Sequence, residues 1–110
     1  MEYSSQYINR VELQGIVGTS RVSNLGEKNA VSFSLATNYA FKDREGYHVI
    51  ETTWHNCTSF VDKEDDLSIY VKGTPLHIEG RLRNLRYTDA CGCERTTIEV
   101  VASRVWRVEP

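Results

Sequence analysis

Hydrophobic and polar residues alternate along four stretches of the chain, which is the period of β-strands that bury one face, and a fifth stretch near the C-terminus is rich in β-forming residues. The first stretch shows the pattern simply: Val11, Leu13 and Val17 share one parity, and mostly polar residues hold the other. Polar clusters with a glycine follow the first, second and fourth stretches and indicate turns. The expected strands cover residues 11–17, 30–36, 48–60, 76–87 and 96–108.

One segment, residues 62–71, departs from this period. Leu67, Tyr70 and Val71 have helical spacing, and they follow an acidic run that a helix dipole favours in its first turn. Gly73 can cap the end of such a helix. Five strands with one short helix between the third and fourth is the order of an OB-fold. We therefore expect an all-β fold, a five-stranded Greek-key barrel, in a single domain over residues 1–110 with its core at about 8–108.

Length and composition agree with a small globular protein. The chain has 110 residues, 40% hydrophobic and 25% charged, enough for one domain. Its apolar runs are too short to cross a membrane, and the N-terminus does not resemble a secretory signal. The net charge of −2 excludes indiscriminate electrostatic binding to nucleic acid, but the run 62–66 alone carries −3. Residues 81–107 hold six arginines against three acids, so a local basic groove remains possible.

The three cysteines allow a metal or redox interpretation and a simpler one. Cys91 and Cys93 flank a single glycine, whereas zinc and redox motifs usually space their cysteines by two or more residues. Cys57 stands alone. Free thiols in a reducing cytoplasm account for all three. We therefore expect no metal and no cofactor.

The outward parity of the fourth expected strand indicates a binding face. Leu76, Ile78 and Leu82 share the parity that would point into the barrel. The opposite parity then carries two arginines and an aromatic residue, Arg83 and Tyr87 among them. Isolated charges would indicate only a solvated face. An exposed aromatic residue beside arginines is what a groove for stacking single-stranded bases requires.

The third expected strand carries two further aromatic residues, Trp54 and Phe60, on one parity. The other parity, which includes His55 and Cys57, holds small residues that could also be buried. Parity alone leaves open whether the aromatic pair lies in the core or on the surface.

The sequence as a whole resembles the bacterial single-stranded DNA-binding protein family. The likeness runs in order over residues 8–108, and five short blocks carry it: NRVEL (9–13), FSLAT (33–37), TWH (53–55), IEGRLR (78–83) and YTD (87–89). The resemblance implies an OB-fold, assembly as a homotetramer, and binding of single-stranded DNA without sequence preference. It also implies a non-enzymatic role in DNA replication, repair and recombination, in the cytoplasm and at the bacterial nucleoid.

The resemblance assigns roles residue by residue. It puts Trp54 and Phe60 on the DNA face. The residues expected to stack on bases are Phe41, Trp54, Phe60 and Tyr87. Those expected to contact phosphates are Lys42, Arg81, Arg83, Arg86 and Arg95, with Arg10, Arg21 and Lys72 as weaker candidates. His55 is expected at a subunit interface, and neither a membrane nor a small-molecule substrate is expected as a partner.

Two departures from the family pattern matter. Asn56 stands where the family often has a basic residue, so one phosphate contact is expected to be missing. The family usually continues into a flexible linker with an acidic tip that recruits replication proteins, whereas this sequence ends at Pro110. We therefore do not expect recruitment through a tail. The alternative function is an OB-fold accessory or protein–protein module of a primosome or conjugation system, with weak DNA contact.

Overall fold

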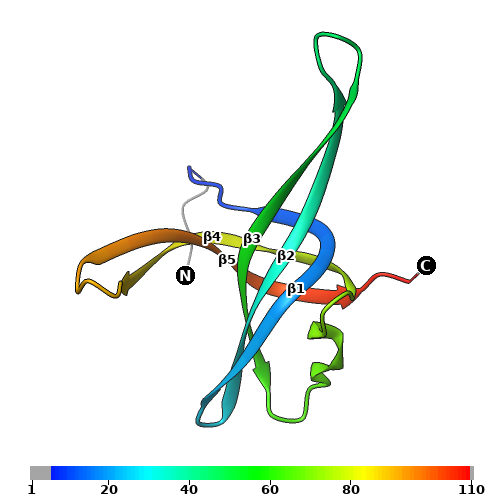
Figure 1. Ribbon diagram of the computed structural model, residues 1–110. Coiled ribbons are helices and arrows are strands. Elements are labelled where there is room, and N and C mark those ends of the chain that lie inside the picture. The colour runs from blue at the N-terminus through cyan, green and yellow to red at the C-terminus, as the bar shows by residue number, and fades with distance from the viewer. Residues whose placement is uncertain (1–5, 110) are drawn as a thin grey trace.

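Residues 6–109, the part of the chain that the computed structural model describes, form five strands that close into a barrel (Figure 1). The strands follow the order β1-β2-β3-β5-β4 around the barrel, and β3 and β5 pair in parallel. This confirms the predicted all-β barrel. The strand bounds are β1 (Val11–Leu25), β2 (Lys28–Lys42), β3 (His48–Asp62), β4 (Pro75–Thr88) and β5 (Glu94–Arg107).

β1 and β2 are longer than predicted, since β1 continues to Leu25 and β2 runs from Lys28 to Lys42, whereas the other three strands lie within two residues of their predicted bounds. β2 and β3 remain paired as far as Lys42 and His48, and β4 and β5 as far as Thr88. Figure 1 shows these two-stranded ribbons leaving the barrel in different directions. The placement of Leu82 inside the barrel was wrong: β1 pairs with β4 only as far as Gly80, and Leu82 is 43% exposed on the ribbon.

The core lies between the sheet and the turn that follows β3. Phe33 packs on Tyr70, with ring centroids 5.1 Å apart, and burial raises the pKa of Tyr70. Gly15 allows β1 to cross β2 closely, because a Cβ there would lie 2.1 Å from the carbonyl oxygen of Ala36. The other buried residues of the core are Val17, Val31, Leu35, Cys57, Val61, Leu76, Ile78, Val100 and Ala102.

The helix expected over residues 62–71 is instead a single 3-10 turn, η1 (Leu67–Tyr70). The acidic residues cause the difference. The Asp62 amide donates to an Asp65 carboxylate oxygen, and the Asp66 carboxylate accepts the Ser68 amide as the N-cap. Aspartates that bond to nearby backbone in this way favour turns and caps over helix interiors. None of the described residues belongs to a helix long and apolar enough to span a membrane.

Candidate nucleic-acid interface

The register of β3 separates its two faces. His55, Cys57 and Val61 belong to the inward row, and Cys57 and Val61 are buried in the core. Trp54 and Phe60 belong to the outward row and are 59% and 43% exposed. The choice that parity left open is therefore decided in favour of the surface for both aromatic residues.

The outward rows of β3, β5 and β4 form one continuous face. Thr58 pairs with Val101 of β5, which pairs in turn with Arg81 of β4. Residues paired across neighbouring strands project on the same side of a sheet. The face defined in this way, called the aromatic face below, carries Trp54, Asn56, Thr58, Phe60, Arg81, Arg83, Leu85, Tyr87, Arg95 and Glu99.

A buried acid lies in the middle of the aromatic face. The side chain of Glu99 is 5% exposed, and its carboxylate accepts the Arg83 Nε–H at 2.6 Å and the Thr58 hydroxyl at 2.8 Å. The guanidinium of Arg83 lies over the Phe60 ring, 5.9 Å from its centroid. Arg83 is therefore already paired, and it supports Phe60. Sequence reasoning assigned Glu99 no role, although it is the only acid among the β-branched and apolar residues of 96–108.

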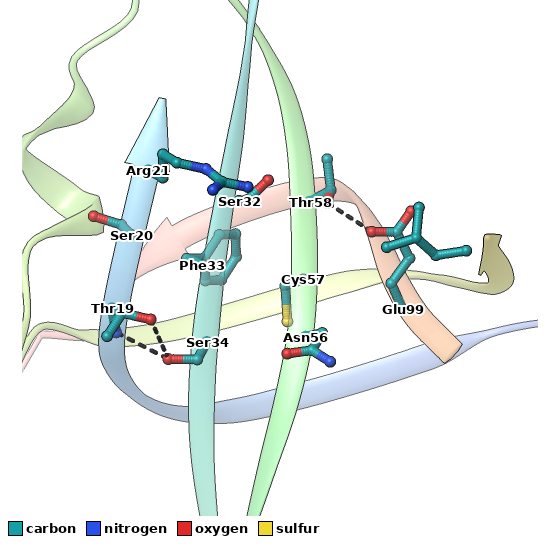
Figure 2. A pocket seen from close by; sticks show the side chains of 11 residues that line it. Thr19, Ser20, Arg21, Ser32, Phe33, Ser34, Asn56, Cys57, Thr58 and Glu99 are labelled. Carbon is teal, nitrogen blue, oxygen red and sulfur yellow. Dashed lines mark hydrogen bonds between the residues drawn. The ribbon is translucent and has the colours of Figure 1, made fainter. Parts of the chain in front are cut away.

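A shallow polar groove runs beside this network (Figure 2), with a volume of about 340 Å³. The figure shows hydroxyl and amide side chains of β1, β2 and β3 along it, with Glu99 of β5 at one end. Arg21, one of the weaker phosphate candidates, lines the groove and has no ion pair among the described residues. The other polar residues of the groove are Thr19, Ser20, Ser32, Ser34, Asn56 and Thr58.

Trp54 lies against a glycine of β1. A Cβ at Gly18 would stand 2.4 Å from Cζ3 of the indole and 2.7 Å from Oγ of Ser34. Gly18 lies where the β1–β2 register shifts, between Val17 and Ser20. The backbone of this irregularity therefore supports the ring of Trp54, an arrangement that sequence spacing alone does not reveal.

A second hollow joins Phe60 to two basic residues. Arg10, Phe60 and Arg81 line it together. Neither arginine forms an ion pair with another described residue, so both charges are available to an anion. Arg10 was one of the weaker candidates for phosphate contact in the sequence, and the structure places it beside Phe60 of the aromatic face.

Two of the expected contact residues lie away from the aromatic face. Phe41 pairs with Val49 and lies on the opposite side of the β2–β3 ribbon from Trp54, with its ring 6.0 Å from that of Tyr39. Arg86 likewise lies on the opposite side of the β4–β5 ribbon from Arg83. Within one chain, the structure does not bring these two residues together with the others.

The remaining basic candidates differ in their pairing with acids and in their exposure. Arg95 pairs with Asp89 at 2.9 Å near the β4–β5 turn, and the pKa of Asp89 is lowered by that bond and by the backbone amides of Cys93 and Cys91. Lys42 and Lys72 are exposed, Lys42 at the end of β2.

His55 is half-buried, and its Nε2 lies 2.9 Å from the Thr37 hydroxyl oxygen. Cys57 is buried, and burial together with the charge of Glu99 raises its pKa to about 12. Such a thiol remains protonated at neutral pH, which excludes Cys57 as a nucleophile. Cys91 and Cys93 are exposed and unbridged.

Comparison with known proteins identifies the fold and the family. The model of the Single-strand binding protein family matches residues 8–108. The chain belongs to this family. Proteins of the family bind DNA and are not enzymes, which agrees with the predicted function class. The resemblance found in the sequence is thereby confirmed.

Two curated relatives illustrate the similarity. The chain is 34% identical over 101 residues to the single-stranded DNA-binding protein of Neisseria meningitidis serogroup A, and 32% identical over 101 residues to that of Xanthomonas campestris pv. campestris. The matches cover 89% of this chain but only 58% and 59% of those proteins. The chain therefore spans somewhat more than half the length of these relatives.

Solved structures show the same fold. The Plasmodium falciparum single-strand binding protein (SSB) in complex with single-stranded DNA superposes with a TM-score of 0.79 at 22% identity, covering 97% of this chain and all of that one. A deletion mutant of the single-stranded DNA binding protein from Thermus aquaticus gives a TM-score of 0.74 at 20% identity, covering 93% of this chain and 51% of that one. The barrel is accordingly an OB-fold.

Proposed function

We propose that this chain binds single-stranded DNA without sequence preference, through its aromatic face. The observation that carries the proposal is the exposure of Trp54 and Phe60 on one continuous surface, beside the unpaired charges of Arg10 and Arg81. Soluble domains normally bury large aromatic rings, whereas a base-stacking platform must present them. Each base stacked on such a ring stabilises the complex by about 1–3 kcal/mol, whatever the base.

The basic residues contribute in different ways. Arg81, with Arg10 beside it, is positioned to neutralise phosphates next to Phe60. Arg83 acts first by holding Phe60, because Glu99 already balances its charge. Arg95 exchanges its bond with Asp89 for a phosphate, and Tyr87 on the neighbouring strand provides a further ring.

Phe41, Lys42 and Arg86 belong to a longer DNA path. Phe41 and Arg86 face away from the aromatic face, so a short oligonucleotide on one chain does not reach them. A longer strand that passes around the ribbons does. The number of nucleotides bound should therefore exceed what the aromatic face alone accommodates.

The wider role follows from the family. We expect the protein to assemble as a homotetramer with His55 at a subunit interface. We expect it to protect single-stranded DNA during replication, repair and recombination, in the bacterial cytoplasm and at the nucleoid. Relatives that share the family are named single-stranded DNA-binding proteins, which supports the DNA-binding part of this expectation.

Titration with oligo-dT tests the proposal. The chain has two tryptophans, so the Trp106→Phe variant leaves Trp54 as the only indole emitter. Its fluorescence should fall on binding, and log K should decrease linearly with log salt, by about 0.7 per phosphate neutralised. Unchanged fluorescence and no binding at low salt would refute the proposal. Binding that does not depend on salt would favour a protein–protein module instead.

A further inference from the structure

Three potential metal ligands gather on the outer surface where β1 and β4 close the barrel. Glu12 of β1 lies directly opposite Glu79 of β4, and His77 lies two residues before Glu79 on the same side of that strand. One ligand atom from each of the three lies within 4.8 Å of the other two. In a tetrahedral zinc site with bonds of about 2.0–2.2 Å, ligand atoms stand roughly 3.4 Å apart. Small side-chain rotations therefore suffice to bring the three together.

The two ring nitrogens of His77 each face a side-chain oxygen of β1. Nδ1 lies 2.8 Å from Oε1 of Gln14, and Nε2 lies 2.9 Å from Oε2 of Glu12. A neutral imidazole has a single N–H, so it can donate to only one of these two acceptors. If Nδ1 donates to Gln14, two lone pairs face each other between Nε2 and Glu12. A metal ion at this point would accept both lone pairs, whereas a Gln14 amide turned over, with its NH2 group on Nδ1, would leave Nε2–H to donate to Glu12.

Two neighbouring side chains fix the orientation of the His77 ring, as the histidine of a metal site requires. Trp106 stacks on His77, with ring centroids 4.4 Å apart and planes inclined by 16°. A metal-binding histidine commonly donates its other N–H to an oxygen that fixes the ring. Gln14 Oε1 occupies that position here. Nε2 is thus directed toward the carboxylates by two contacts that involve neither glutamate.

Arg104 is the group with which a metal ion must compete. Its Nη1 lies 3.1 Å from Oε1 of Glu79. The guanidinium also lies 5.1 Å from the centre of a Trp106 ring, and the side chain is 70% exposed. Arg104 can therefore release Glu79 and keep its contact with the indole.

We propose that Glu12, His77 and Glu79 bind a divalent transition-metal ion, Zn²⁺ in particular, across the β1–β4 seam. The imidazole nitrogen selects against Mg²⁺ and Ca²⁺, which prefer oxygen ligands throughout. Three protein ligands on an exposed surface leave a fourth position to water. The ion would connect the two strands that close the barrel. Because it binds the folded chain, it would raise the thermal midpoint.

The exposed thiols must first be removed as competing ligands. The Cys91→Ser/Cys93→Ser variant, called the thiol-free variant, serves as the reference protein. Calorimetric titration with Zn²⁺ should give saturable binding of one ion per chain. Co²⁺ should produce visible absorption, and in a Trp54→Phe version of the thiol-free variant it should quench Trp106, the only remaining tryptophan.

Single substitutions in the thiol-free variant locate the site. His77→Gln and Glu12→Gln should each weaken Zn²⁺ binding at least tenfold, and Gln14→Leu should weaken it by about 10- to 100-fold through the ring orientation. Arg104→Gln should strengthen binding, because Glu79 is then released. His48→Gln is the matched control: His48 is an exposed histidine at the far end of the β2–β3 ribbon, and its loss should change nothing.

Three results would overturn the proposal. The first is no saturable Zn²⁺ binding to the thiol-free variant, which would mean that the contacts with Glu12 and Gln14 serve only to hold His77 in place. The second is equal loss of affinity in His77→Gln and His48→Gln. The third is a thermal midpoint of the thiol-free variant that Zn²⁺ leaves unchanged. None of these measurements involves DNA, so the outcome is independent of the proposed function.

Discussion

Gly18 lies directly beneath the indole of Trp54: a Cβ built on this glycine would stand 2.4 Å from Cζ3. The contact holds the most exposed ring of the aromatic face against the backbone of β1, so its plane is set before any ligand arrives. Binding to a ring that is already oriented loses less side-chain entropy than binding to a mobile one. The contact therefore links a backbone irregularity to the affinity of the site.

Gly18→Ala should displace Trp54 and weaken oligo-dT binding, by no more than the roughly 1–3 kcal/mol that one stacked base provides. Fluorescence titration of wild type, Gly18→Ala, Trp54→Ala and the double variant measures the coupling. Because Gly18 acts through the ring, the double variant should bind no more weakly than Trp54→Ala alone. Additive losses would show that Gly18 acts by another route.

Trp54→Ala by itself should weaken binding to dT, dC and dA oligomers by a similar amount, about 1–3 kcal/mol. Stacking uses the face of the base, and every base has one. Parallel titrations with the three homopolymers make the comparison, with Tyr47→Ala as a control at an exposed aromatic residue of the β2–β3 turn. A loss confined to one base would instead indicate hydrogen-bond recognition by the polar groove.

Glu99→Gln should change folding stability and DNA affinity in opposite directions. It removes the carboxylate that balances Arg83, and a charge-assisted bond of this kind lost from a half-exposed arginine costs about 1–3 kcal/mol of unfolding free energy. The released guanidinium should strengthen DNA binding. It should also make the slope of log K against log salt steeper by about 0.7, the value for one more neutralised phosphate. Urea unfolding and a salt titration measure the two effects.

Thr58→Val is the control for this prediction, since it removes the other bond to Glu99 without changing a charge. It should destabilise the protein and leave the salt dependence as it is. If Glu99→Gln also leaves the salt dependence unchanged, Arg83 does not reach phosphate.

Arg81→Gln and Arg86→Gln should differ according to the length of the DNA. Arg81 lies beside Phe60, so its loss should make the slope of log K against log salt shallower by about 0.7 even with short oligomers. Arg86 lies on the other side of the ribbon, so its loss should matter only for strands long enough to pass around it. Equal effects with the shortest oligomer that binds would contradict the single aromatic face.

Alkaline unfolding should report the burial of Cys57. Its pKa rises from 9.0 to about 12 in the folded state, because burial and Glu99 disfavour the thiolate. The stability linked to this thiol is fully present below pH 9 and is lost as the pH rises toward 12, at up to about 1.4 kcal/mol per pH unit. Cys57→Ala should therefore have a shallower loss of stability between pH 9 and 11.

Iodoacetamide provides a second measurement of the same property. Cys91 and Cys93 are exposed and should react rapidly at pH 8, whereas Cys57 should react only as the protein unfolds. Three equally fast thiols in the native protein would contradict the buried position of Cys57.

The alternation of residue types determined much of this protein without its structure. Four period-2 patterns and one β-rich stretch located five strands, and the family resemblance, rather than the pattern, assigned Trp54 and Phe60 to the DNA face. The pattern failed where local chemistry competed with it. The carboxylates of Asp65 and Asp66 accept nearby backbone amides and replace the expected helix by a turn, and Leu82 is exposed because β1 pairs with β4 only as far as Gly80.

Only the tertiary structure decided which residues work together. Glu99 and Arg83 are 16 residues apart, and Glu99 and Thr58 are 41 apart, so no local pattern could pair them. The same holds for Gly18 under Trp54, and for Glu12 and His77 across the β1–β4 seam. Period-2 alternation describes one strand at a time, because it depends only on the direction in which each side chain points. Partnerships between strands depend on register, bulges and barrel closure, and these are settled when the strands pack.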